Sequence, residues 1–378
     1  MIPVKKYIYY FWKKGTEKAN QQLIDKHIKT SLALFHNCES RKPDQQIKQE
    51  MRALQKYWGC RATQYYEYGM YRSDYRATMD EMNEFIPYYF LPFVFFPRVN
   101  PVYYKISDEK NIANAFFDYY QIPRTHTLFK YHGGRFYNGY EEVISDTQAF
   151  ESLELPDLKT IFIKPAHGMQ GMGIQRFIKE GNNFVNDEGR KFDTRFLQGL
   201  NDVLYLIEKG MEQHPLLSEI YPHALNTIRI LTKTEGQEVK LILAFLRMGT
   251  GGDHIDNSSK SIAVKINLDS GRLEEFAISN YLKKLSKHPD TGFVFKNTAL
   301  PHWDVIMEAI PVMARKFAFI KFIGWDIAIT PDGFRVIEIN RSPALKKAQL
   351  LHGGLKSKLE ITNPKDWYYN TNYNMEEL

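Results

Sequence analysis

One stretch near the end of the chain, GWDIAITPDGFRVIEINRSPAL at residues 324–345, constrains the fold more than any other. Two apolar runs flank a Thr-Pro-Asp-Gly turn, in which proline favours a φ of about −65° and glycine tolerates a positive φ. The pattern predicts a β-hairpin with a three-residue loop, in which Thr330 pairs with Phe334. Counting outward from that pair places Asp326 directly opposite Glu338.

Asn340 is expected on the same face as Glu338, because side chains alternate along a strand. Opposed carboxylates on β-carbons about 4.5–5.5 Å apart destabilise a sheet unless a proton or a cation intervenes. Mg²⁺ prefers oxygen ligands and usually shares its shell with water and phosphate. The hairpin therefore predicts a magnesium and nucleotide site, with a solvent-facing hairpin that carries scattered acids as the alternative.

Composition limits the class of protein and its partners. The 378 residues, 43% of them hydrophobic, suffice for one large domain or two ordinary ones. The net charge of +6 favours anionic small molecules as partners. Nucleic acid is not an expected partner, because basic runs interleaved with aromatic residues are lacking.

The cysteines and the most apolar segment bear on localisation. Cys38 and Cys60 are far apart and lack zinc-site spacing, which favours a reducing cytoplasm. Residues 85–97, FIPYYFLPFVFFP, are too short to span a bilayer and contain three prolines, so we expect a buried core segment. No transmembrane segment or signal peptide is expected, and a peripheral membrane contact of the basic N-terminal region is the alternative.

Helices are expected over residues 1 to about 80 and again after Ser107, the predicted N-cap of a helix that carries Lys110 and stops before Pro123. Next, KTIFIKPAHGMQGMGIQRF predicts a strand from Thr160 to Lys164, a glycine-rich loop and a second strand. Dinucleotide-binding and P-loop motifs both need a helix there, so both are excluded. The loop is suited to phosphate binding through backbone N–H groups, or is an ordinary flexible turn.

Two long strands follow in LNTIRILTKTEGQEVKLILAFLRMGTGG, joined by a turn at Gly236. Arg229 and Arg247 lie within these strands. An arginine in a strand usually faces water, but phosphoryl chemistry needs fixed guanidinium groups. Both interpretations are open for these two residues.

Taken together, these segments resemble the ATP-grasp superfamily, and more narrowly the sugar-transfer-associated ATP-grasp family found near polysaccharide biosynthesis enzymes. The resemblance spans about residues 85–345. It is carried by the motifs DEKN, FIKPAHGMQGMGI, LIEKGMEQHP, LNTIRILT, FLRMGTGG, DN at 256–257 and GWDIAITPDGFRVIEINRSP, in this order. The sequence SSKS follows DN where the family has a Gly-Gly pair.

The resemblance implies an α/β (α+β) ATP-grasp fold, with two α+β subdomains that grip ATP and a helical N-terminal region. The implied division is a mainly helical region over residues 1–107, an ATP-grasp domain over 108–345 and a C-terminal extension over 346–378 packed on it. A mobile lid subdomain is expected over about 122–205.

The resemblance also implies roles for single residues, with ATP and Mg²⁺ as cofactors. The expected cofactor-binding residues are Lys110, Lys164, His167, Gly168, Gly171, Gly173 and Glu208, of which the lysines contact phosphates and Glu208 lies beside the adenine. The expected metal ligands are Asp326, Glu338 and Asn340. The expected catalytic residues, which contact the transferred phosphoryl group, are Arg229, Arg247 and Arg341.

The implied activity is ATP-dependent carboxylate–amine ligation through an acyl phosphate, with release of ADP and phosphate. The expected partners are a small-molecule carboxylate and an amine, and the product is an amino acid or similar group attached to a sugar, nucleotide sugar or polysaccharide precursor. The alternatives are a kinase that phosphorylates a hydroxyl group and a non-catalytic nucleotide-binding protein.

Overall fold

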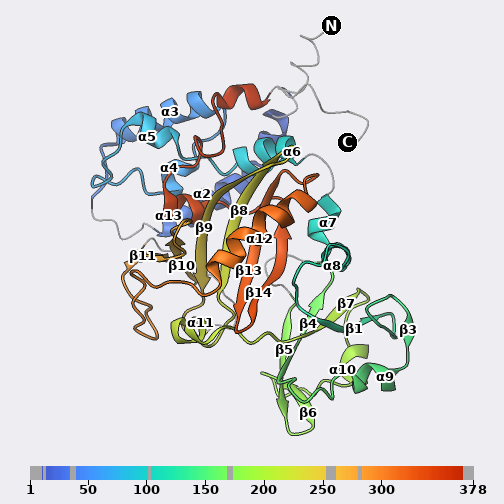
Figure 1. The fold of residues 1–378 in the computed structure, drawn as a ribbon. Helices are drawn as coiled ribbons and strands as arrows, with labels where there is room; N and C mark the ends of the chain where they lie inside the picture. Colours follow the sequence, from blue (N-terminus) through green and yellow to red (C-terminus); the bar gives the residue numbers. More distant parts are fainter. Residues whose placement is uncertain are drawn as a thin grey trace.

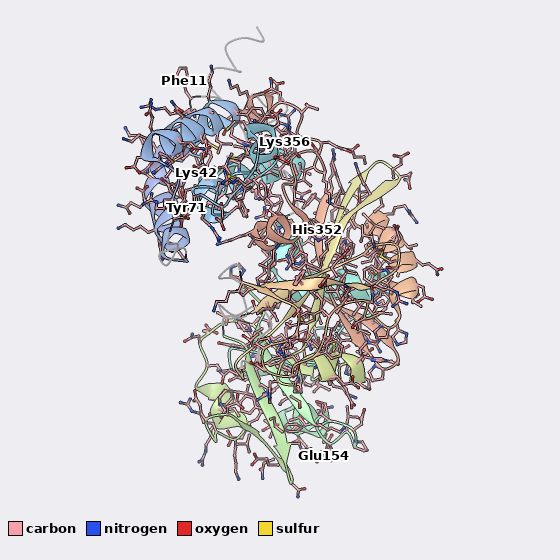
Figure 2. All side chains as sticks on the ribbon, turned by 90° about the vertical axis from the view of Figure 1, so that its left-hand side faces the viewer. Phe11, Lys42, Tyr71, Glu154, His352 and Lys356 are labelled. Carbon is pink, nitrogen blue, oxygen red and sulfur yellow. The ribbon has the colours of Figure 1, made fainter. Side chains whose placement is uncertain are left out.

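The computed structural model describes residues 11, 14–34, 40–100, 104–167, 173–252, 261–279 and 283–368. Figure 1 shows a helical N-terminal region, a long central sheet below it, and a smaller sheet at the opposite end of the molecule. In Figure 2, Lys42 and Tyr71 accordingly lie far from Glu154, which marks the smaller sheet. The predicted α+β class, with two sheet-based subdomains and a helical N-terminal region, is confirmed.

The central sheet is antiparallel, with the order β12-β11-β10-β9-β8-β13-β14. Its strands are β8 Thr227–Glu235, β9 Glu238–Met248, β10 Ile262–Ile266, β11 Leu273–Ser279, β12 Lys284–Leu285, β13 Phe322–Thr330 and β14 Gly333–Asn340. Both faces of the sheet are covered, so β8 and β13 are buried almost throughout. The predicted pair of long strands before the hairpin is confirmed.

Two different cores cover the two faces. One core joins the central sheet to α8 Lys110–Tyr119, α11 Pro215–Ile220 and α12 Trp303–Lys316. The other joins it to the N-terminal region, to α13 Lys346–His352 and to the short helix η2 Pro364–Tyr368. The alternation along β13 follows this division, because Trp325 packs into the first core and Phe322 into the second.

The smaller sheet has the order β3-β2-β1-β7-β4-β5-β6 and its own core. Its elements are β1 Thr127–His132, β2 Arg135–Tyr137, β3 Val143–Ile144, α9 Asp146–Glu151, β4 Thr160–Pro165, β5 Gln175–Glu180, β6 Asn183–Asn186, α10 Thr194–Gln198 and β7 Tyr205–Lys209. The strand pair around the glycine-rich loop is therefore β4 and β5, as predicted. The last strand in sequence, β7, lies between β1 and β4 at the centre of the sheet.

The N-terminal region is helical, as predicted, within the residues that the structure describes. Its helices are α2 Gln21–Leu34, α3 Asp44–Trp58, α4 Gln64–Glu67, α5 Met79–Asn83, the π-helix η1 Leu91–Phe95, α6 Phe96–Val99 and α7 Tyr104–Asp108. The segment 85–97 is core, with Phe90, Val94 and Phe95 fully buried. None of the described helices is long and apolar enough to cross a membrane.

The predicted N-cap at Ser107 is wrong. Ser107 lies inside α7, and its hydroxyl donates to Asp108 Oδ1 at 3.3 Å. The backbone then becomes extended at Glu109, with φ −119° and ψ 107°, and helix α8 begins at Lys110. The predicted end before Pro123 is correct, because α8 stops at Tyr119.

Candidate functional site

The hairpin of β13 and β14 places Asp326 opposite Glu338, as predicted, but by a different route. Thr330 pairs with Gly333, so the loop has two residues, and the predicted three-residue loop is wrong. A β-bulge after Asp326 then adds one residue to β14, so that Ile327 faces Val336 while Asp326 faces Glu338. The shorter loop and the bulge offset each other, which is why the acids still meet.

Asp326 is almost fully buried, at 2% exposure, between two guanidinium groups. It lies opposite Arg229 on β8, whose Nε and Nη2 donate to its two oxygens, the latter at 2.9 Å. Arg247 Nη2 on β9 lies 3.0 Å from Asp326 Oδ2. Burial alone would raise the pKa of Asp326, but the charges of Arg229 and Arg247 outweigh burial and hold this pKa well below its usual range.

Glu338 has the opposite shift. Burial raises its pKa to about 7, and the neighbouring negative charge of Asp326 adds to the effect. Asn340 Nδ2 donates to Glu338 Oε1 at 3.1 Å and reaches Asp326 Oδ2 at 3.5 Å. The predicted trio thus lies together, with one permanently charged acid, one acid that titrates near neutral pH, and one amide.

Lys110, at the junction with the smaller sheet, interacts electrostatically with Glu338 of this trio. The Lys110 backbone N–H donates to the Ala166 carbonyl at 2.9 Å, which joins the start of α8 to the end of β4. Burial lowers the pKa of Lys110, the negative charge of Glu338 opposes this shift, and Lys164 adds to it. Lys110 thus interacts with both Glu338 and Lys164, which lie on different sheets.

Glu208 on β7 holds Lys164. Lys164 Nζ donates to Glu208 Oε2 at 2.7 Å, and the Glu208 side chain is only 6% exposed. Asn114 on α8 donates to the other carboxylate oxygen at 3.4 Å. The predicted contact of Glu208 with adenine stays a prediction, whereas its contact with the phosphate-site lysine is a feature that the sequence did not reveal.

The glycine-rich loop is described only at its ends. Gly168 and Gly171 lie outside the described residues, as does Cys38. Gly173 has a φ of +75°, and a β-carbon there would lie 3.2 Å from the Pro165 ring, so glycine suits the start of β5. His167 is largely exposed, with Nδ1 3.8 Å from Glu109 Oε2.

The Arg341 guanidinium contacts an acid of α7. Its Nη2 donates to Asp108 Oδ2 at 3.3 Å. Its carbonyl accepts from Asn100 Nδ2 at 2.8 Å, and the same amide group donates to the Phe322 carbonyl at 2.7 Å. Asn100, buried in the N-terminal region, therefore fixes the end of β14 that follows the candidate metal ligands. A lone asparagine ahead of a proline gave no sequence signal for this role.

Lys130 is a further buried cation that the sequence reasoning missed. It lies on β1 at 6% exposure, and its ammonium group pairs with Glu141. Glu141 also accepts from Asn111 on α8 at 3.2 Å. This chain of contacts links the smaller sheet to α8 next to Lys110. Alternation places Lys130 on the face of β1 opposite the core residues Phe129 and Tyr131, so the sequence pattern gave no sign that it is buried.

Two antiparallel subdomains that bring lysines and paired acids together define a protein of the ATP-grasp class. A family model described as sugar-transfer associated ATP-grasp matches residues 95–363. Because this match covers well over half of the chain, the chain belongs to the sugar-transfer associated ATP-grasp family. The predicted family and the prediction of an ATP-grasp enzyme are confirmed. A search of curated proteins gives no match.

Solved structures with similarity to the chain include D-alanyl-alanine synthetase A from Vibrio cholerae O1 biovar eltor, at 13% identity and a TM-score of 0.41, over 70% of this chain and 66% of that one. VanG D-Ala:D-Ser ligase from Enterococcus faecalis has 12% identity and a TM-score of 0.41, over 69% and 61%. Biotin carboxylase from Campylobacter jejuni has 10% identity and a TM-score of 0.41, over 72% and 48%. The chain spans about two thirds or less of each.

Proposed function

We propose that this protein is an ATP-dependent carboxylate–amine ligase. The γ-phosphoryl group of ATP passes to a substrate carboxylate, which forms an acyl phosphate and ADP. An amine then attacks the acyl carbon, the phosphate leaves, and an amide forms. The observation that carries this proposal is the interaction of Lys110 with both Glu338 of the opposed acid pair and Lys164 of the smaller sheet, since this arrangement combines cations suited to phosphate with opposed carboxylates.

The lysines are proposed to orient the phosphates. Lys164 is held by Glu208, so its ammonium group is positioned before ATP binds. Lys110 begins α8, which packs on the central sheet, and its backbone N–H donates to the Ala166 carbonyl directly after β4, so this contact links the two lysines across the junction of the subdomains. Arg341, next to Asn340, is proposed to contact the transferred phosphoryl group once ATP competes with Asp108 for its guanidinium.

Mg²⁺ is proposed to bind at Asp326, Glu338 and Asn340. The donor set fits, because it offers only oxygen ligands once the Asn340 amide turns its oxygen inward, and two carboxylates suit an ion that completes its shell with water and phosphate. Burial and the charge of Asp326 raise the pKa of Glu338, so a divalent cation between the two carboxylates would relieve their repulsion. When bound, Mg²⁺ would neutralise phosphate charge. Arg229 and Arg247 keep Asp326 ionised and fix its orientation.

The acceptor is proposed to be a sugar, nucleotide sugar or polysaccharide precursor, which is supported by the family description alone. The described ranges contain no cluster of three or more His, Cys, Asp or Glu side chains with the geometry of a metal site. The proposed ion therefore depends on the nucleotide for part of its shell. The division at residues 107 and 345 and a lid over about 122–205 remain proposals, with the sheet itself extending to Lys209.

Product analysis tests the proposed reaction. The protein is incubated with Mg-ATP and pairs drawn from amino acids, uronic acids and nucleotide sugars, and ADP, phosphate and product masses are measured. A ligase gives a product whose mass equals both substrates minus water, with phosphate release only when carboxylate and amine are both present. A stable phosphomonoester would establish the kinase instead. Nucleotide binding without turnover on any pair would favour the non-catalytic alternative.

A further inference from the structure

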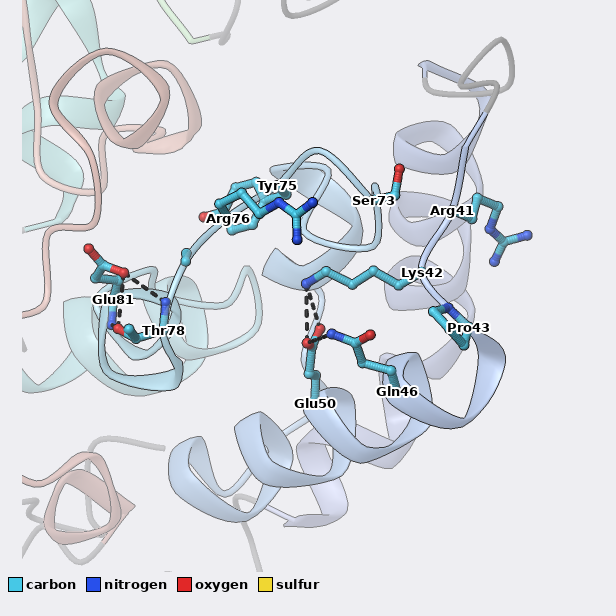
Figure 3. A pocket seen from close by; sticks show the side chains of 11 residues that line it. Arg41, Lys42, Pro43, Gln46, Glu50, Ser73, Tyr75, Arg76, Thr78 and Glu81 are labelled. Carbon is cyan, nitrogen blue, oxygen red and sulfur yellow. Dashed lines mark hydrogen bonds and ion pairs between the residues drawn. The ribbon is translucent and has the colours of Figure 1, made fainter.

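A cavity of about 540 Å³ opens in the N-terminal helical region, separate from the acid hairpin. Residues 41–43, the first two turns of α3 and the segment 73–81 that leads into α5 form its walls. Figure 3 shows the side chains that line it. Pockets for small organic ligands span about 300–1,000 Å³, so this cavity has the size of a ligand site.

The carboxylates in the cavity wall already have partners. Glu50 accepts from Lys42 Nζ at 2.9 Å, from Gln46 at 2.8 Å and from the Tyr65 hydroxyl at 2.6 Å. Burial alone would raise the pKa of Glu50, but these three hydrogen bonds outweigh burial and lower the pKa. Glu81 closes a capping box with Thr78 at the start of α5. Neither acid therefore needs a cation from the remaining wall.

The cavity wall has more cationic side chains than acidic ones. Arg41 and Arg76 both line the cavity, and within the described ranges neither forms an ion pair with an acid. The Arg41 guanidinium lies over the Tyr71 ring at 5.5 Å. In Figure 3 the Arg76 and Lys42 side chains extend toward the same space. Positive groups that face a common cavity repel each other unless an anion lies between them.

The rest of the wall is polar and partly aromatic. Ser73 and Thr78 offer hydroxyl groups, and Tyr75 presents a ring with Lys42 Nζ 5.7 Å from its centroid. Burial raises the pKa of Tyr75 to about 12, so its hydroxyl remains a neutral donor. Hydroxyl groups, an amide from Gln46 and an aromatic face match a polyhydroxylated ligand better than an apolar one.

From these contacts we infer that the cavity binds an anionic saccharide, a sugar that carries a phosphate or carboxylate group. The guanidinium of Arg76 binds the anionic group, and the hydroxyl and aromatic wall contacts the sugar ring. This site is distinct from the acid hairpin and does not depend on the proposed ligase reaction. Its binding is therefore measurable without turnover.

Calorimetric titration of the full chain tests the inference, with glucose 6-phosphate and glucuronic acid as anionic probes and glucose and inorganic phosphate as controls. At least one anionic sugar should bind more tightly than both controls, and the one that binds identifies the anionic group. Arg76→Gln should weaken that binding about tenfold or more. The matched variant Arg52→Gln, which changes an exposed arginine of α3 outside the cavity, should leave it unchanged.

A second variant and a competitor distinguish this cavity from the hairpin site. Arg76→Glu reverses the charge at an exposed position of the wall, and it should abolish sugar binding while the melting temperature is retained. Saturating ADP with Mg²⁺ should not change the sugar affinity. The inference is overturned if neither anionic sugar binds, if inorganic phosphate binds as tightly as glucose 6-phosphate, or if Arg76→Gln binds the sugar as tightly as the wild type.

Discussion

Replacing Glu338 by glutamine removes a buried negative charge that is unfavourable in the folded protein. Burial and the neighbouring Asp326 raise the pKa of Glu338 from 4.5 to about 7. Each pH unit between these two values corresponds to about 1.4 kcal/mol, so the ionised carboxylate costs the folded protein about 3 kcal/mol. Glutamine has nearly the same shape and no charge, and the Glu338→Gln variant avoids this cost.

The sign of the pH dependence follows from where the proton is held. The folded protein keeps the Glu338 proton to a higher pH than the unfolded chain does. The stabilisation that the folded protein gains by holding this proton is therefore complete below pH 4.5, and it is lost as the pH rises to about 7. Relative to the wild type, the Glu338→Gln variant should gain up to about 3 kcal/mol in free energy of unfolding between pH 5 and pH 8.

Urea unfolding in metal-free buffer at pH 5, 6, 7 and 8 measures this difference, because groups other than Glu338 titrate alike in both proteins. The control is Glu238→Gln, which replaces an exposed glutamate at the start of β9 and should follow the wild type at every pH. A difference between the wild type and Glu338→Gln that is equal at pH 5 and pH 8 would refute the reasoning.

Four further variants test the other contacts of the site. Arg229→Met should lower the free energy of unfolding by about 3–5 kcal/mol in urea, because Asp326 then keeps one guanidinium partner instead of two. Lys164→Ala should reduce both stability and the melting shift with Mg-ATP, whereas adding Glu208→Gln should restore the stability alone, because the buried carboxylate is then removed. Gly173→Ala should cost about 1 kcal/mol in thermal unfolding, because its φ is +75°.

The hairpin was predicted correctly in part from the sequence. Apolar periodicity and a turn motif correctly predicted two paired strands with Asp326 opposite Glu338. The loop length was wrong, and a bulge in β14 compensated for it. The adjacent apolar residues Val336 and Ile337 break the strict alternation, which was the local sign of a bulge.

The local sequence patterns did not predict contacts between strands that are distant in the sequence. Arg229 was left open between a wet face and a phosphoryl contact; the strand order places it against Asp326, and its contact with the transferred phosphoryl group stays a prediction. Lys164 and Glu208 are 44 positions apart, and they meet because β7 inserts between β1 and β4. Strand order is a tertiary property, so neither ion pair follows from periodicity or turn chemistry.

No sequence motif indicated the N-terminal cavity. Its wall combines the start of α3 with a segment about 30 residues later, and the residues share only charge and hydroxyl chemistry. The helical character of this region was predictable from its composition, whereas the way its helices enclose a space depends on packing. A cavity of this kind is visible only once the helices are placed.

Magnesium-dependent nucleotide binding at the hairpin is the central claim, and one titration tests it most directly. Calorimetry is performed with ADP in the presence and absence of Mg²⁺ on the wild type, on Glu338→Gln and on the Glu238→Gln control. The account predicts that Mg²⁺ tightens ADP binding to the wild type and the control by about tenfold or more, and that this gain is lost in Glu338→Gln. An equal gain from Mg²⁺ in all three proteins would contradict the metal site.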